Sequence, residues 1–340
     1  MKKSLIIVGM AALVLGACHK VDTVVTETPQ EIGFKAISAN ATKANAQLEG
    51  NLLNKDYSIY ASATQKNSAG AIENAAFFVD QQFQTEATEV DASSQYRAWN
   101  GTEAAPIYWP VGGAAVDFLA YALPTAKHGN PAATYANQAE DVASIVAFND
   151  WNTYDNQVDL LYAVNNGATS STSGATDYVK LSFKHAQALL VFQAKVNTPN
   201  AITINSITID GLKVKGTFTV DNSRNDLVAS WSNLKTEDAM NTIADGADST
   251  TDNLGEALTS TTDFAQIGST LLVPQQPRLN FTVNYTMGGN TMNYTYNEAR
   301  GTWEMGKKYI YKLDMTLSEI ILTEEVADFV DAAVPEIPLN

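Results

Sequence analysis

Apolar and polar residues alternate along much of the chain with a period of two, which is the spacing of a half-buried β-strand. Residues 57–63 place Tyr57, Ile59 and Ala61 on one face, and residues 115–123 are apolar on both faces, as in a central strand of a sandwich. Few segments show the spacing of apolar residues that is typical of an amphipathic helix. The pattern therefore predicts an all-β fold.

The clearest hairpin lies in residues 278–297. Apolar residues alternate with polar ones on both sides of a turn at Gly288, Gly289 and Asn290. The alternating apolar positions are Leu279, Phe281, Val283, Tyr285, Met287, Met292, Tyr294 and Tyr296. Two neighbouring antiparallel strands are expected here.

Residues 202–220 contain a break in alternation. Ile202 and Ile204 occupy even positions, whereas Ile207 and Ile209 occupy odd ones. Because a slip of one residue moves every later side chain to the other face of a sheet, we expect a bulge or a turn in this segment.

We place a domain boundary after the apolar run 158–164. Residues 165–176 have alanines as their only hydrophobes and the small polar composition of a linker or long loop. After it, residues 179–196 are expected to form one long or bent strand. Short strands separated by turn signals suggest β-sandwiches, and the length of the chain suggests two of them.

The N-terminus has the features of an export signal. Lys2 and Lys3 precede an apolar stretch over residues 5–15, which is too short to cross a bilayer of roughly 30 Å as a helix. Residues 15–18 resemble the bacterial lipobox, in which the cysteine is acylated and becomes the new N-terminus. Cys18 is the only cysteine of the 340 residues, so we expect it to serve as a lipid anchor and no disulfide to form.

The chain is acidic. Without Lys2 and Lys3, 19 basic residues oppose 37 acidic ones, and the formal charge falls from −16 to −18. Nucleic-acid binding depends on neutralising phosphates with lysine and arginine, so this balance argues against a nucleic-acid partner.

No motif of an active site or a cofactor site is present, and we expect no catalytic residues, no metal and no cofactor. His19 lies beside the anchor, His128 is expected to be a loop residue with nothing nearby to orient it, and His185 is expected to be a packed, hydrogen-bonded strand residue. Three acidic residues could in principle hold calcium, but a solvated loop is the better interpretation because EF-hand spacing is missing. They are Asp245, Asp248 and Asp252.

Five tryptophans could form a platform for stacking sugars, or could fill sandwich cores, which we expect for most of them. They are Trp99, Trp109, Trp151, Trp231 and Trp303.

Several segments in this order resemble the Bacteroidales fimbrillin family, the lipoprotein-derived subunits of type V pili. Besides the lipobox at Cys18, they are IGFKAISANATKANA, IYWPVGGAAVDFLAYALP, VDLLYAV, VKLSFKHAQALLVFQAKV, LLVPQQPRLNFTVNYTM, WEMGKKYIYKLDMTL and SEIILTEEVADF. The resemblance implies two tandem transthyretin-like β-sandwich domains after a lipoprotein signal peptide. It divides the chain into a signal peptide (1–17), a lipidated segment with a displaceable first strand (18–43), two domains (44–166 and 167–322) and a tail (323–340).

The resemblance also implies assembly by strand exchange. A protease of trypsin-like preference would cut after Lys43, before Ala44, and free a first strand with Ile32, Phe34 and Ala36 on one face. Lys35 and Lys55 are weaker alternatives for the cut, and a solvated loop is the other interpretation of Lys43. The partners implied are other fimbrillin subunits, the processing protease and, before processing, the outer membrane. The mature location implied is a cell-surface fimbria.

The implied donor strand lies in the acidic C-terminal tail, whose last seven residues could equally be a frayed terminus. Its apolar positions are Val326, Phe329, Val330, Val334, Ile337 and Leu339. Pro335 and Pro338 cannot donate to a β-ladder, which leaves open a tip or anchor subunit without a functional donor end. The alternatives to a pilin are a monomeric glycan-binding lipoprotein of the cell surface and a surface hydrolase on a β scaffold.

Overall fold

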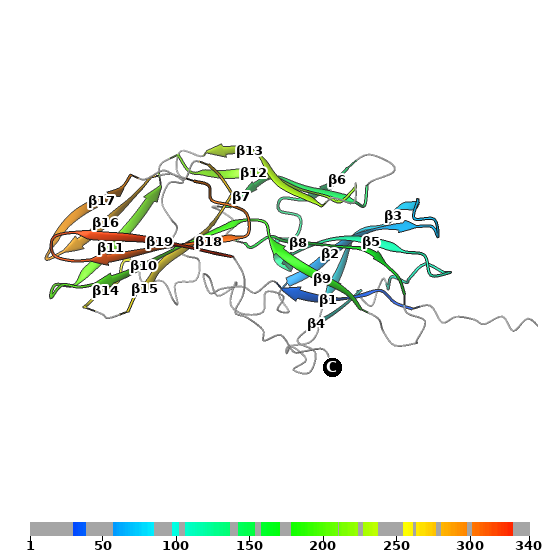
Figure 1. Cartoon of the computed structure of the whole chain (residues 1–340), viewed down its shortest axis with the longest axis horizontal. Coiled ribbons are helices and arrows are strands. Elements are labelled where there is room, and N and C mark those ends of the chain that lie inside the picture. Colours follow the sequence, from blue (N-terminus) through cyan, green and yellow to red (C-terminus); the bar gives the residue numbers. More distant parts are fainter. Residues whose placement is uncertain are drawn as a thin grey trace, which may run out of the picture.

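A computed structural model of the chain shows an elongated, almost entirely β protein, which confirms the predicted fold class (Figure 1). The structure describes residues 30–38, 57–84, 97–101, 106–136, 142–153, 158–170, 178–209, 211–223, 227–236, 254–260, 263–276, 280–297 and 301–328. In this part of the chain the one helical element is a short 3₁₀ turn, Thr125–Lys127. No helix there is long and apolar enough to cross a membrane.

The first layer is a closed barrel of seven strands in the order β1-β4-β3-β2-β5-β8-β9. Their bounds are β1 Gly33–Ser38, β2 Tyr57–Lys66, β3 Ile72–Gln84, β4 Arg97–Gly101, β5 Val116–Pro124, β8 Leu161–Ala168 and β9 Tyr178–His185. Apolar side chains from every second position fill the barrel, among them Ile59, Phe118 and Leu181. This inward alternation is the one that the sequence predicts for residues 57–63.

A four-stranded sheet, here called the outer sheet, covers one side of the barrel (Figure 1). It consists of β6 Ala133–Tyr135, β7 Ile145–Asn152, β12 Lys213–Asp221 and β13 Val228–Thr236, in the order β13-β12-β7-β6. Its Phe148, Trp151 and Phe218 pack against Tyr121 and Tyr162 of the barrel. Most of β5 and the first residues of β8 are therefore buried on both faces, which explains why residues 118–123 are apolar throughout.

The other half of the molecule is a sandwich of two four-stranded sheets. The inner sheet contains β10 Ala188–Val196, β15 Ala265–Leu272, β18 Lys307–Met315 and β19 Ile320–Asp328, in the order β15-β10-β18-β19. The distal sheet contains β11 Ile202–Ile209, β14 Ala257–Leu258, β16 Phe281–Met287 and β17 Asn290–Tyr296, in the order β14-β11-β16-β17. Phe192, Phe281 and Tyr311 form the centre of the core between them.

Two local predictions about the distal sheet are confirmed. The hairpin consists of β16 and β17, joined at Gly288 and Gly289, whose positive φ angles of 58° and 80° suit glycine. In β11 the pairing with β16 shifts between Ile204 and Ser206, so Asn205 is the extra residue of a bulge. All four isoleucines of the strand thereby stay in the core.

The segment 179–196 is two strands rather than one. β9 ends at His185 in the barrel, and β10 begins at Ala188 in the inner sheet. Along β10, Leu189 and Val191 belong to the barrel core, whereas Leu190 and Phe192 belong to the sandwich core. Burial on both faces explains the continuous apolar sequence of residues 188–192.

Strand pairing crosses the boundary expected at residues 166 and 167. β9 closes the barrel beside β1 and β8, and β12 pairs with β7 of the earlier half. A division at residue 166 would therefore separate strands that share hydrogen bonds. Alternation in a sequence tells which face of a strand is buried, but it does not tell which strand is its neighbour.

Candidate functional site

The first described strand, β1, is inserted between two barrel strands. It pairs antiparallel with β4, from Gly33 opposite Asn100 to Ala36 opposite Arg97. On its other edge it pairs parallel with β9, from Gly33 opposite Tyr178 to Ser38 opposite Phe183. Because both edges of β1 are paired, this strand closes the barrel.

Residues before β1 continue the backbone pairing. The Ile32 N–H donates to the Ile107 carbonyl at 2.7 Å, and the Trp109 N–H donates to the Gln30 carbonyl at 2.9 Å. Glu31 lies opposite Tyr108 in an antiparallel bridge. The whole segment 30–38 is thus held by backbone hydrogen bonds, a contact with residues 107–109 that the sequence reasoning did not identify.

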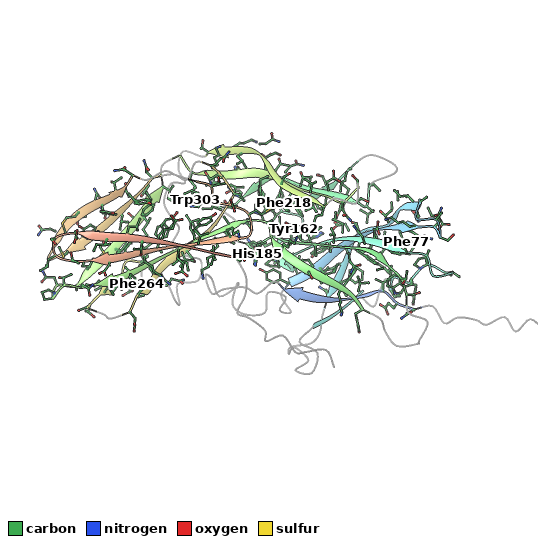
Figure 2. All side chains as sticks on the ribbon, viewed as in Figure 1. Phe77, Tyr162, His185, Phe218, Phe264 and Trp303 are labelled. Atoms are coloured by element: carbon green, nitrogen blue, oxygen red, sulfur yellow. The ribbon has the colours of Figure 1, made fainter. Side chains whose placement is uncertain are left out.

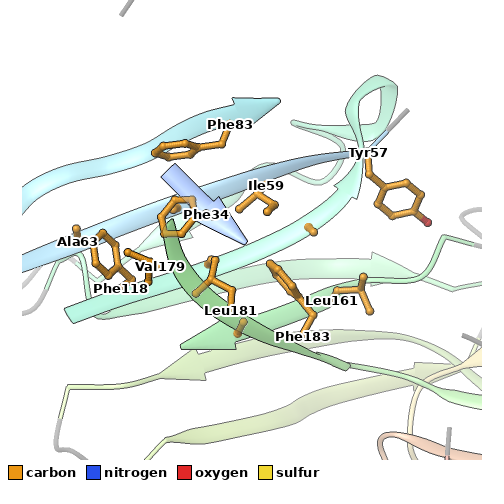
Figure 3. Packing of buried hydrophobic residues seen from close by; sticks show 14 of the residues in the cluster. Phe34, Tyr57, Ile59, Ala63, Phe83, Phe118, Leu161, Val179, Leu181 and Phe183 are labelled. Atoms are coloured by element: carbon orange, nitrogen blue, oxygen red, sulfur yellow. The ribbon is translucent and has the colours of Figure 1, made fainter. Parts of the chain in front are cut away.

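The side chains that point inward from this segment are fully buried. Ile32 and Phe34 are both 0% exposed. The ring of Phe34 meets Phe83 edge-on at 4.6 Å between centroids and Phe118 at 5.3 Å (Figure 3). The structure thus places two of the three residues predicted for the inner face of the displaced strand in the barrel core. Ala36 is described only as a backbone partner of Arg97 and Leu181.

The strands that flank β1 have few other partners in the described part of the barrel. β4 pairs with β3 at two positions, Phe83 with Gly101 and Gln84 with Asn100. β9 pairs with β8 at two positions, both near its C-terminal end. If β1 left, β4 and β9 would face each other with unpaired N–H and C=O groups across a slot lined by the partners of Phe34. Such a slot can accept another extended segment with apolar residues at alternate positions.

The C-terminal end of β9 is fixed by a buried hydrogen bond between His185 and Asp159. His185 Nδ1 lies 2.6 Å from Asp159 Oδ2, and both side chains are almost completely buried. This confirms the prediction that His185 is a packed, hydrogen-bonded residue, although no sequence pattern indicates that Asp159 is its partner. Burial, together with the nearby Asp159 carboxylate, raises the pKa of Tyr57 well above its ordinary value.

The two residues after β9, Ala186 and Gln187, connect the barrel with the outer sheet and with the sandwich. The Ala186 N–H donates to the Leu160 carbonyl, and the Trp231 indole of the outer sheet donates to the Ala186 carbonyl. The Gln187 carbonyl accepts a hydrogen bond from Gly306 of the sandwich half. Figure 2 shows His185 in the middle of the molecule, between the barrel and the sandwich. One wall of the slot is therefore anchored independently of β1.

At the other end of the described chain, β19 is an edge strand. It pairs with β18 alone, antiparallel, and Val326 lies opposite Tyr309. The second domain was expected to end at residue 322, but the strand continues to Asp328. Val326, predicted as part of the donor, is thus already in a ladder and is 50% exposed. The other predicted donor residues, Phe329, Val330, Val334, Ile337 and Leu339, lie outside the described residues.

Several positions predicted from the sequence lie outside the described residues. They are Cys18, Lys43, Ala44, Asp245, Asp248 and Asp252. Among the described residues no group of three or more His, Cys, Asp or Glu side chains could hold a metal ion.

The prediction that nothing orients His128 was wrong. Its Nε2 lies 3.3 Å from Asp80 Oδ2, and its ring stacks on Tyr60 at 3.9 Å. Asp80 comes 48 residues earlier, a separation that local sequence cannot bridge.

Three of the tryptophans are core residues, as expected. Trp109, Trp151 and Trp303 are 7%, 1% and 0% exposed, so none of them can offer its face to a sugar. Trp231 is half-buried against Phe218. The side chain of Trp99 lies outside the described part of the chain.

Comparison with known proteins gives one family match. The model of the fimbrillin-like family matches residues 38–328. The chain belongs to this fimbrillin-like family. No curated protein matches it.

Solved structures share the fold of this fimbrillin-like chain. A fimbrial protein from Bacteroides vulgatus superposes with a TM-score of 0.56 at 14% identity, over 88% of this chain and 99% of the other. A candidate cell adhesion protein from Bacteroides uniformis gives 0.52 at 15% identity, over 88% and 98%. Another from Bacteroides ovatus gives 0.52 at 16% identity, over 90% and 100%. At such low identity these likenesses establish the fold only, while the family is one of fimbrial structural proteins rather than enzymes.

Proposed function

We propose that this fimbrillin-like chain is a structural subunit of an adhesive cell-surface fimbria that polymerises by strand exchange. The observation that carries the proposal is β1, a strand near the N-terminus that closes the barrel on both edges and buries Ile32 and Phe34 completely. Its removal would open a slot that only another extended segment can fill.

In this proposal Cys18 anchors the exported precursor to the outer membrane, and β1 keeps its slot occupied. A protease with trypsin-like preference cuts after Lys43, so the segment that contains β1 is no longer covalently joined to the barrel. The cut removes the tether but not the contacts of β1. Displacement therefore requires a second strand that regains most of the buried area and hydrogen bonds.

The proposed donor is the C-terminal tail of a neighbouring subunit. Val330, Ala332 and Val334 would share one face of an extended segment and could replace Ile32 and Phe34 in the slot. β19 supports this assignment because it runs to Asp328 and so delivers the tail from the edge of the inner sheet. A head-to-tail contact of this kind does not close on itself, so it extends into a filament.

The proposal is tested on protein sheared from the cell surface. We expect N-terminal sequencing to begin at Ala44 and unboiled gel electrophoresis to give a ladder of heat-sensitive multimers. Lys43→Ala should abolish both, whereas the matched variant Lys55→Ala should leave both unchanged. A lipidated N-terminus at Cys18 in the sheared protein, with monomer only, would contradict the polymerising subunit and favour an anchor subunit or a monomeric lipoprotein.

A further inference from the structure

On the solvent face of the distal sheet, threonine and asparagine side chains of β11, β16 and β17 are arranged in three rows, and we call this set of side chains the Thr/Asn face. One outer row crosses the strands as Thr208, Thr282 and Thr295. The other outer row crosses them as Thr203, Thr286 and Thr291. The middle row consists of Asn284 and its partner Asn293, with Asn205 of the bulge beside them.

Hydrogen bonds join the three asparagine side chains in one direction. Asn205 Nδ2 donates to Asn284 Oδ1 at 2.7 Å and to Thr286 Oγ1 at 3.1 Å, and Asn284 Nδ2 donates to Asn293 Oδ1 at 2.8 Å. Among the described residues Asn293 accepts a side-chain hydrogen bond but donates none, so the chain of amides ends in an N–H₂ group on an exposed residue. Hydrogen bonds in a chain polarise one another, which makes this terminal group a better donor.

The face carries no charge, although the protein as a whole has a formal charge of −16. No residue of β11, β16 or β17 is Asp, Glu, Lys or Arg. The outer sheet offers a contrast, because its β12 and β13 carry Lys213, Lys215, Asp221 and Lys235. An uncharged face of this kind neither attracts nor repels an ionic partner.

The chemistry and size of the face exclude several classes of partner. A nucleic acid requires lysine or arginine at its phosphates. Stable protein interfaces bury roughly 800 Å² on each partner and centre on aromatic or arginine anchors. Strand spacings of roughly 4.8 Å and rises of roughly 3.3 Å per residue give this face roughly 300 Å² with its side chains, and its rows contain no such anchor. A ligand of neutral hydroxyl groups matches its donors and acceptors.

We propose that the Thr/Asn face binds the hydroxyl groups of a neutral polysaccharide. Binding by a single subunit would be weak, since the site is flat and its groups partly satisfy one another. If the chain polymerises as proposed above, each subunit presents the same face, and many weak contacts along a fimbria act together. Only this increase in avidity rests on the proposed function, because the contact itself belongs to the single chain.

The test is affinity electrophoresis of the purified full chain in native gels that contain dextran, galactomannan or hydroxyethylcellulose. We expect at least one of these neutral polymers to reduce the mobility at least twofold, and acidic polygalacturonate to have no such effect. Thr291→Glu, which adds a charge to the face, should restore free mobility. Ser232→Glu adds the same charge at an exposed position of β13 and should still be retarded.

Three results would overturn the proposal: free mobility in all three neutral polymers, retardation of the Thr291→Glu variant equal to that of the parent chain, or equal loss in both variants. Thermal unfolding of both variants shows that each is folded before the gels are compared, and Thr291→Ser provides a second variant that should retain binding. Because the gels use unassembled chain, their outcome is independent of whether fimbriae form.

Discussion

The two strands nearest the ends of the described chain are built in opposite ways. β1 is paired on both edges, and its inward side chains Ile32 and Phe34 are completely buried. β19 is paired on one edge, and its Ile321 and Val326 are 47% and 50% exposed. The barrel core therefore depends on its terminal strand, whereas β19 contributes only the partly buried Ile320 and Leu322 to the edge of the sandwich core.

This difference indicates where each half could exchange a strand. Loss of β1 would expose the core of the barrel and two unpaired edges, so the vacant site would bind a replacement strongly. Loss of β19 would uncover one edge of β18 and little of the sandwich core. A slot whose vacancy would expose a core suits an acceptor, and the proposed donor is the tail that follows the edge strand β19 rather than β19 itself.

The largest expected effect comes from truncating the inward side chain of β1. Phe34→Ala should lower the free energy of unfolding by about 3–5 kcal/mol, because it removes the contacts with Phe83 and Phe118 and leaves a cavity. Val326→Ala in β19 should change it by less than about 0.5 kcal/mol, as for an exposed position. Urea denaturation measures the free energy of unfolding of both variants. Equal losses would contradict the difference between β1 and β19.

The next effect concerns the wall of the β1 slot. Asp159→Asn should lower the free energy of unfolding by about 1.5–3 kcal/mol, because it removes the charge from the buried hydrogen bond that fixes His185. Asp150→Asn, in an exposed pair with Lys235, is the matched control and should have a much smaller effect. Urea denaturation measures both variants. If both lose the same free energy of unfolding, the buried pair of His185 and Asp159 does not anchor β9.

A smaller effect is expected at Tyr57, the first residue of β2. Among the described residues its buried hydroxyl has no hydrogen-bond partner, so Tyr57→Phe should change the free energy of unfolding at pH 7 by less than about 1 kcal/mol. Burial raises the pKa of Tyr57 above its ordinary value of 10.0 in the folded chain. The folded state therefore keeps this proton above pH 10 when the unfolded state has lost it, and stability falls as the pH rises further.

Thermal unfolding from pH 9 to pH 11 measures this dependence. The Tyr57→Phe variant should lose less stability over the range than the parent chain. Identical slopes would show that Tyr57 does not titrate with unfolding.

The smallest effects belong to the exposed ion pairs that join β19 to β18. Lys312 lies 2.7 Å from Glu325, and its hydrogen bond and charge lower the pKa of that carboxyl. The resulting stabilisation is present above the ordinary carboxyl pKa of 4.5 and is lost as the pH falls through the lowered value. Glu325→Gln should shift the melting temperature slightly at low salt and not at 1 M salt. A large shift that salt does not change would mean that β19 is held more firmly than its single ladder indicates.

Local features of the fold could be predicted from the sequence, because they depend on alternation within one segment. The bulge at Asn205, the hairpin at Gly288 and the shared inward face of Ile32 and Phe34 are of this kind. The pairing of β12 with β7 and the contact of residues 30–32 with 107–109 depend on distant segments, whose neighbours alternation does not specify. The same limit applies to Asp159 as the partner of His185, since single ionisable residues carry no sign of their partner.

Hydrogen exchange of the chain that begins at Ala44 reports whether another strand replaces β1 beside β9. We expect the backbone amides of residues 178–183 to exchange rapidly in its monomer, where β1 is missing, and slowly in its multimers, where another strand fills the slot. Removal of residues 329–340 should prevent both the multimers and the regained protection. Slow exchange of these amides in the monomer, or multimers that form equally well without residues 329–340, would contradict strand exchange at the β1 slot.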